Sequence, residues 1–254
     1  MMKNPFPLSY GYFVAFDHPK IRVPIPENMI SRVRVGDYAI APEHGLYLKA
    51  LYALRLRYEV CEDNENIFRI SYQKLQIHSH DPGELDVQNK ALYAFFSNAY
   101  SFYESYCFMM FMLGSIIKRN DELFNIDERK ITHSSTLKAF LKNFPNEDLT
   151  TNMNKILQSK NFRYIKRIRN ILNHCINPHR RVLVGVDPRN GGKIIASTEY
   201  LDGIGLKESE PRKLHEKYLS TYLNALTSDR DQLLDAYMQF IEKYFPSKEL
   251  RTQK

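Results

Sequence analysis

The run of apolar residues between Val87 and Lys118 constrains the fold more than any other feature of the sequence. Its aromatic and aliphatic side chains recur at steps of three and four residues, which is typical of a helix with one broad buried face. The apolar stretch after Ser105 has about 12 residues, fewer than the roughly 20 needed to span a bilayer. We therefore expect a long core helix rather than a membrane span.

The first 80 residues differ from this region in composition and in pattern. Prolines interrupt them repeatedly, which disfavours a long helix. Several short runs alternate apolar with polar side chains or are rich in β-branched and aromatic residues, as strands often are. The expected strands cover residues 13–16, 33–41, 54–60 and 68–77, with residues 61–66 as a hairpin loop. A helix over residues 46–56 is the competing interpretation, because that run is apolar on nearly every face.

Asp81, Pro82 and Gly83 form a turn sequence, and we expect a domain boundary there. The sequence thus predicts an α+β protein, with a β-rich N-terminal region over residues 1–82 and an antiparallel helical bundle over residues 83–250. Within the bundle region, two β-like runs flank a turn rich in Asn and Gly, which predicts a β-hairpin insertion at about residues 181–199.

The positive charge of the chain is concentrated in one segment. The sequence contains 36 Lys and Arg against 29 Asp and Glu, a formal net charge of +7. Seven of the basic residues lie between Lys160 and Asp187, with no acid among them. Because such a segment attracts polyanions, we expect a nucleic acid rather than a membrane as partner.

Most of this basic segment follows helical spacing, and Pro178 marks its end. Arg169 and His174 lie about 140° apart around such a helix, whereas Asn170 shares the stripe of His174. Arg169 and His174 therefore converge only through a long side-chain reach, a local unwinding before Pro178, or a second copy of the helix. The apolar residues of the buried face are Phe162, Ile165, Ile168, Leu172 and Cys175.

The stretch from Arg169 to His174, Arg-Asn-Ile-Leu-Asn-His, resembles the motif of the HEPN superfamily. The ribonucleases of that family carry an Arg, usually followed by a polar residue, and a His a few positions later. The resemblance covers residues 86–245 and implies a HEPN-like helical bundle. It also implies a homodimer that pairs two motifs across a cleft and cleaves RNA without a metal. Such enzymes often act as toxins or in phage defence, so an antitoxin or other inhibitor protein is an implied partner.

Cleavage of RNA without a metal needs a base for the 2′-hydroxyl proton, an acid for the leaving oxygen and a cation for the phosphate. His174 suits the proton transfers near neutral pH, and Arg169 can clamp the phosphate with two N–H groups. Asn170 is expected to hold the imidazole or to contact the phosphate, although an Asn and a His one turn apart can simply bond each other. Glu104 is expected to pair with Arg169 or to orient His174, and an exposed glutamate without a role is the alternative.

Further residues of the basic segment are expected to contact the RNA backbone, in a way that salt weakens. A solvated basic face without a ligand is the alternative interpretation of this set. Its members are Arg163, Lys166, Arg167, Asn173, His179, Arg180 and Arg181.

Other kinds of site find little support in the sequence. The run His78-Ser79-His80-Asp81 could look like a metal site, because alternating residues on a strand point the same way, but no partner ligand is identifiable, so we expect no metal and no other cofactor. The three cysteines are far apart and indicate no disulfide framework. The first residues do not form a signal peptide, and a cytoplasmic protein is expected. Two other functions stay open: a non-catalytic HEPN-like module that binds RNA or a protein, and a scaffold whose basic helix docks an acidic protein.

Overall fold

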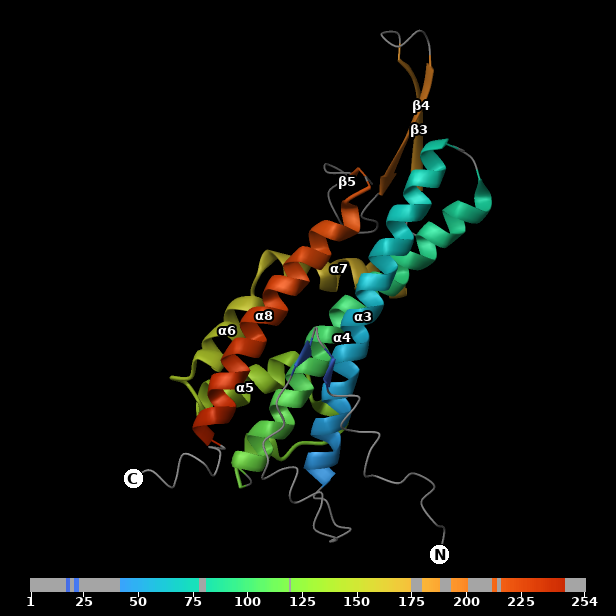
Figure 1. Ribbon diagram of the computed structural model, residues 1–254. Coiled ribbons are helices and arrows are strands. Elements are labelled where there is room, and N and C mark those ends of the chain that lie inside the picture. Colours follow the sequence, from blue (N-terminus) through green and yellow to red (C-terminus); the bar gives the residue numbers. More distant parts are fainter. Residues whose placement is uncertain are drawn as a thin grey trace, which may run out of the picture. The chain divides into compact units, whose positions relative to one another are not determined.

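The computed structural model describes residues 17–18, 21–22, 42–77, 81–118, 120–174, 180–187, 193–200, 212–213 and 216–244 (Figure 1). For the strands and a few helix residues, His174 among them, only the backbone is described. The chain divides into two compact units. The first comprises residues 1–56, 102–157 and 229–254, and the second comprises residues 57–101 and 158–228.

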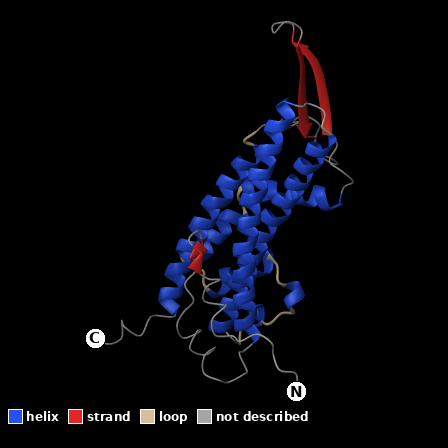
Figure 2. Ribbon diagram, turned by 45° about the vertical axis from the view of Figure 1, so that its right-hand side comes forward, coloured by secondary structure: helices blue, strands red, loops and turns tan. Residues whose placement is uncertain are grey.

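Helices account for most of the described chain (Figure 2). The two longest, α3 (Pro42–Ile77) and α4 (Pro82–Ile117), have 36 residues each. At the start of α4, the Asp81 carboxylate accepts a hydrogen bond from the Gly83 N–H at 2.8 Å, and proline occupies the first helical position, where its missing N–H costs nothing. The turn sequence at residues 81–83 thus begins a helix, and the expected core helix over residues 87–118 is confirmed.

In the first unit, parts of α3, α4 and α8 (Tyr218–Tyr244) share an aromatic core. The Tyr47 and Tyr237 hydroxyls hydrogen-bond each other, and the Tyr106 hydroxyl donates to the Leu233 carbonyl at 3.1 Å. All three tyrosine side chains are buried. Each hydroxyl therefore needs such a partner, and these bonds fix the position of α8 against the two other helices.

Shorter helices complete the first unit. They are the single turns η1 (Glu122–Phe124) and η2 (Glu128–Lys130), followed by α5 (His133–Asn143) and α6 (Asp148–Leu157). Thr132 caps α5, because its hydroxyl accepts a hydrogen bond from the Ser135 N–H at 3.1 Å. A cluster of rings joins η1 and α5 to α4 and α8: Phe111, Phe124, Phe140, Phe144, Phe240 and Tyr244.

In the second unit, α3 and α4 run antiparallel. The Cys61 thiol donates to the Phe95 carbonyl at 3.6 Å, and further along α3 the Ser71 hydroxyl donates to the Glu84 carbonyl at 2.7 Å. The first turns of α8 pack against both helices, and α7 (Lys160–His174) packs on α4. The rings that join α8 to α3 and α4 are Phe68, Phe96, Tyr218 and Tyr222.

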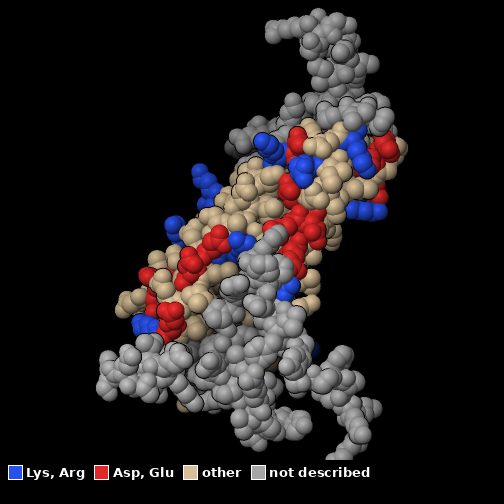
Figure 3. Space-filling view, in the orientation of Figure 1, with Lys and Arg blue, Asp and Glu red and all other residues tan. Residues whose placement is uncertain are grey.

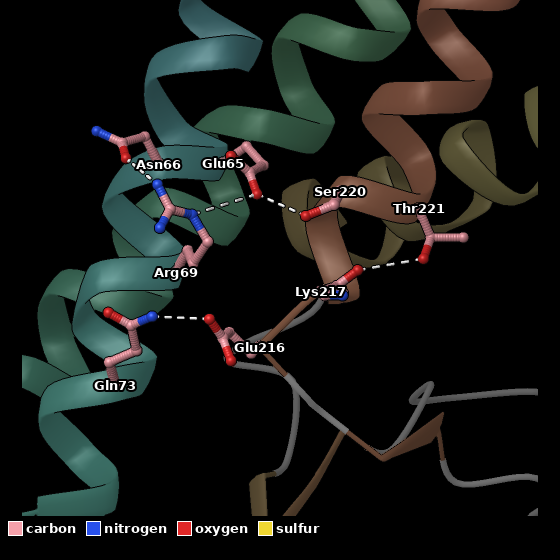
Figure 4. A network of polar contacts seen from close by, with 8 residues as sticks. All are labelled: Glu65, Asn66, Arg69, Gln73, Glu216, Lys217, Ser220 and Thr221. Atoms are coloured by element: carbon pink, nitrogen blue, oxygen red, sulfur yellow. Dashed lines mark hydrogen bonds and ion pairs between the residues drawn. The ribbon is translucent and has the colours of Figure 1, made fainter.

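A polar network holds the beginning of α8 on α3 (Figure 4). The Glu65 carboxylate accepts a hydrogen bond from the Ser220 hydroxyl at 2.6 Å and pairs with Arg69 at 3.9 Å. One turn beyond Arg69, the Gln73 amide donates to the Glu216 carboxylate at 2.7 Å. The Glu65 carboxylate on α3 is thus used for a contact between helices.

Strands occur in two places, and only their backbone is described. β1 (Asp17–His18) pairs with β2 (Ile21–Arg22). β3 (Arg180–Asp187) pairs antiparallel with β4 (Lys193–Tyr200), which also pairs with β5 (Arg212–Lys213). Apart from short connections, every part of the chain whose side chains are described is helical.

The α+β expectation is therefore wrong, and the fold is α-helical. Helix α3 runs unbroken through the strands expected at 54–60 and 68–77 and through the loop expected at 61–66. The hairpin insertion expected at about 181–199 does not make the protein α+β, because helices account for most of the described chain. The strands expected at 13–16 and 33–41 lie outside the described residues. The buried residues of α3 recur at helical steps: Leu51, Leu54, Tyr58, Cys61 and Phe68.

The competing interpretation, a helix over residues 46–56, was right in kind but too short. The domain boundary expected after residue 82 falls in the first turn of α4 and stays a prediction. Within the described ranges, no helix combines the length and the apolar character needed to cross a membrane.

Candidate nucleic-acid interface on helix α7

Helix α7 carries most of the residues predicted to bind RNA. Ser159 directly precedes the helix, and its hydroxyl accepts a hydrogen bond from the Phe162 N–H at 3.1 Å and so caps the first turn. Phe162, Ile165 and Ile168 are buried, as their spacing predicts. His174 is the last residue of α7, and residues 175–179 lie outside the described part of the chain.

Two side chains of α7 contact the ring of Tyr100 on α4. The Phe162 ring stacks on it with centroids 6.1 Å apart and planes at 26°. The guanidinium carbon of Arg169 lies 4.9 Å from the centroid of the Tyr100 ring, within the range of a cation–π contact. Arg169 is half-buried there. Its position is therefore set by an aromatic surface and not by a carboxylate.

Asn170 is the second partner of Arg169. Its side-chain oxygen accepts a hydrogen bond from the Arg169 Nη1 at 3.1 Å. Asn170 lies about 40° from His174 around the helix, whereas Arg169 lies about 140° away. The bond to Asn170 therefore joins the guanidinium to a residue on the side of α7 that carries His174. The approach of Arg169 to His174 stays a prediction, because only the backbone of His174 is described.

The remaining cations of α7 have no acidic partner within the described part of the chain. Arg163 is exposed, and Lys166 and Arg167 are half-buried. Elsewhere in the same unit several cations are paired, as Arg69 is with Glu65 and Lys74 is with Glu84 at 2.7 Å. On the face of the molecule drawn in Figure 3, too, several basic side chains lie close to acidic ones. The unpaired cations make α7 suited to a polyanionic ligand.

Several predicted site residues are not brought into this arrangement. Glu104 is exposed on α4 in the first unit, whereas Arg169 belongs to the second, and Glu104 forms no ion pair with any described residue. Asn173 is exposed near the end of α7. His179 lies outside the described residues, and for His174 and for Arg180 and Arg181 at the start of β3 only the backbone is described. The roles predicted for all of them stay predictions.

Tyr100 is the residue of this interface that the sequence did not single out. The available signal was the pair Phe162 and Arg169, which are seven residues apart and so lie on one face of α7. This spacing indicates that a third side chain lying between Phe162 and Arg169 can contact both of them, but it does not indicate which helix supplies that side chain.

Metal ligands are not gathered in the described ranges, where no group of three or more His, Cys, Asp or Glu side chains is placed to hold an ion. His78 and His80 lie outside those ranges. No family model, no curated protein and no solved structure matches the chain. The resemblance to HEPN proteins therefore rests on the motif residues, and the activity it implies is a proposal.

Proposed function

We propose that the protein is a metal-independent endoribonuclease of HEPN type, acting as a homodimer. The arrangement around Arg169 carries the proposal: the guanidinium is held by Tyr100 and Asn170 and has no acidic partner among the described residues. Of its five N–H groups, one is used by Asn170, so the others are left for a ligand. A role in a toxin–antitoxin pair or in phage defence, with an inhibitor protein as partner, belongs to the same proposal.

In the proposed reaction a base takes the proton of an RNA 2′-hydroxyl, and the 2′-oxygen attacks the adjacent phosphorus. The bond between phosphorus and the 5′-oxygen breaks, and an acid gives the leaving oxygen its proton. His174 acts as base or acid, and Arg169 binds the phosphate oxygens, whose charge grows in the transition state. The products are a 2′,3′-cyclic phosphate and a 5′-hydroxyl.

The course of α7 supports a site completed by a second copy. The helix is continuous to His174, so a local unwinding between Arg169 and His174 does not bring the two residues together. Arg169 bonds to Asn170, which lies on the stripe of His174, and the same stripe of a second α7 supplies another histidine. A homodimer with two facing motifs therefore brings an Arg169 and a His174 together in one site.

A non-catalytic RNA-binding module is the second candidate. It is favoured by the fact that both contacts of Arg169 are made within one chain and that one of them, with the Tyr100 ring, also helps to dock α7 on α4. This module binds RNA through the same cations but leaves it intact. Cleavage is therefore the property that separates the two functions.

The test is incubation of RNA with the purified protein in excess EDTA, alongside the His174→Ala and Asn161→Ala variants. Asn161 is exposed on the same helix and lies outside the motif, so its variant is a matched control. We expect wild type and Asn161→Ala to cleave alike, and His174→Ala to be slower by about 100-fold or more. Equal cleavage by His174→Ala would remove the proposed mechanism, and RNA binding without cleavage by wild type would favour the module.

A further inference from the structure

Tyr100 on α4 contacts the Arg169 guanidinium from a neighbouring helix. Its side chain is only 6% exposed, and its ring meets Phe162 at 6.1 Å between centroids and the Arg169 guanidinium carbon at 4.9 Å. Phe162 and Arg169 are two helical turns apart, about 10.5 Å along the helix axis. One ring at the level between them can therefore touch both, which fixes α7 lengthwise on α4 at this point.

The way in which Tyr100 holds Arg169 matters for its chemistry. A carboxylate partner would occupy the N–H edge of the guanidinium and would neutralise its charge. An aromatic ring instead attracts the flat face of the cation and leaves the edge N–H groups unused. With one N–H bonded to Asn170, enough donors remain for a bidentate contact with a phosphate group.

We propose that Tyr100 is a positioning residue, which holds the Arg169 guanidinium by its face so that the N–H edge meets a backbone phosphate of bound RNA. The inference rests on the proposed function insofar as the ligand is a phosphodiester of RNA. It does not require that the RNA be cleaved. Tyr100 is nearly buried, so it acts through Arg169 and not by stacking on a base.

Packing alone is the competing role for Tyr100, and Phe162 offers the matched control. Both side chains belong to the contact between α4 and α7, but the ring contact and the hydrogen bond of the guanidinium are made with Tyr100 and Asn170. Phe162→Leu weakens the packing and leaves the ring under Arg169. Tyr100→Leu removes the ring, and Tyr100→Phe keeps it without the hydroxyl. Tyr100→Met replaces Tyr100→Leu if that protein does not fold, as judged by its circular dichroism.

The experiment measures the affinity for a single-stranded RNA oligonucleotide at several salt concentrations in EDTA, with all variants made in the His174→Ala background so that the RNA stays intact. We expect Tyr100→Leu to bind about tenfold more weakly, the loss of one hydrogen bond to a charged group. The slope of log affinity against log salt should fall by about 0.7, one phosphate contact on a single strand. Tyr100→Phe and Phe162→Leu should stay within about twofold of the parent, with an unchanged slope.

A double-mutant cycle decides the outcome. Tyr100→Leu should have no further effect on binding when Arg169 is already alanine, because both changes remove the same contact. An equal loss in the Arg169→Ala background, an equal loss from Phe162→Leu, or unchanged binding by Tyr100→Leu would overturn the proposal. It would also fail if the parent bound no RNA. Binding that follows the expected pattern, without cleavage by the wild-type protein, would instead refute only the ribonuclease.

Discussion

Cys61 and Cys107 show how burial controls the reactivity of single residues. Both thiols lie in helical cores, and burial raises the pKa of each above its usual value. Thiolate is the reactive form of cysteine, so both residues are disfavoured as nucleophiles in the folded protein. They fill the core as small apolar side chains.

A Cys175→Ser variant allows this to be measured, because only these two thiols remain. We expect both to react with a chromogenic disulfide reagent at least about 100-fold more slowly in the folded protein than in the unfolded chain, since reaction requires opening of the core. The release of the coloured thiolate gives the rate. A thiol that reacts at the unfolded rate under native conditions would show that its core is not closed.

Asp229 is a buried carboxyl on α8 that accepts a hydrogen bond from the Tyr103 hydroxyl at 2.7 Å. Burial raises the pKa of Asp229, although the Tyr103 bond and the charge of Lys155 oppose the shift. The folded protein thus holds this proton more tightly than the unfolded chain does. Stability therefore falls as the pH rises from the ordinary carboxyl value of 3.8 through the raised pKa, and the contribution is constant above it.

Asp229→Asn removes the buried charge and keeps an oxygen acceptor for Tyr103. We expect its free energy of unfolding to exceed that of wild type at pH 7, with the gain shrinking toward pH 4. Tyr103→Phe leaves the carboxylate without this donor and should cost about 2 kcal/mol at pH 7. Urea denaturation at several pH values measures both. An Asn variant less stable than wild type at pH 7 would show that the charged carboxylate stabilises the fold.

At the scale of elements, the sequence predicted the helices whose apolar stripe is uninterrupted. Helix α4 and the basic helix α7 belong to this class. Helix α3 was missed because charged and amide side chains at residues 62–66 look like a loop and residues 54–60 alternate like a strand. The helix is nevertheless set by the buried side chains from Leu51 to Phe68, while the polar residues lie on its outer sides.

In the candidate site, too, the sequence predicted what depends on a local pattern of residues. The cations of α7 and the Arg169 to His174 motif could be read from one segment, because they depend only on residues near one another in sequence. The contact of Arg169 with Tyr100 joins helices far apart in the chain, and only the packing of α7 on α4 creates it. The position of Glu104 in a different unit from Arg169 likewise depends on how the chain packs and not on any local pattern.

Two glycines allow a matched test of helix packing. An added Cβ at Gly114 on α4 would overlap the ring of Phe124, whereas at Gly45 in the first turn of α3 nothing lies within 4 Å. We expect Gly45→Ala to raise the free energy of unfolding by about 0.5–1 kcal/mol through helix propensity. Gly114→Ala should lower it by about 1–3 kcal/mol through overpacking.

Chemical denaturation measures both changes. In the double variant Gly114→Ala with Phe124→Leu, the loss should be smaller than the sum of the two single losses, because the leucine makes room for the added methyl group. Stabilisation by alanine at both positions would mean that η1 does not hold Phe124 against α4.

At the scale of the whole molecule, the positive charge is unevenly distributed. The chain carries a formal net charge of +7, and five of its cations lie on α7 without an acidic partner among the described residues. Lysines and arginines elsewhere are more often paired, as Lys243 is with Glu147 at 2.6 Å. The proposed ribonuclease is based on helix α7. Its cations have no acidic partner among the described residues, it presents Arg169 by its N–H edge, and it ends in His174.

The chemistry of the fragment ends tests that claim most directly. RNA is incubated with wild-type protein in excess EDTA, and the new ends are examined by enzymatic labelling and ligation. Attack by the 2′-hydroxyl predicts 5′-hydroxyl ends that accept a phosphate without prior phosphatase treatment, and 3′ sides closed as 2′,3′-cyclic phosphates. Fragments with 5′-phosphate and 3′-hydroxyl ends, or RNA that stays whole, would contradict the account.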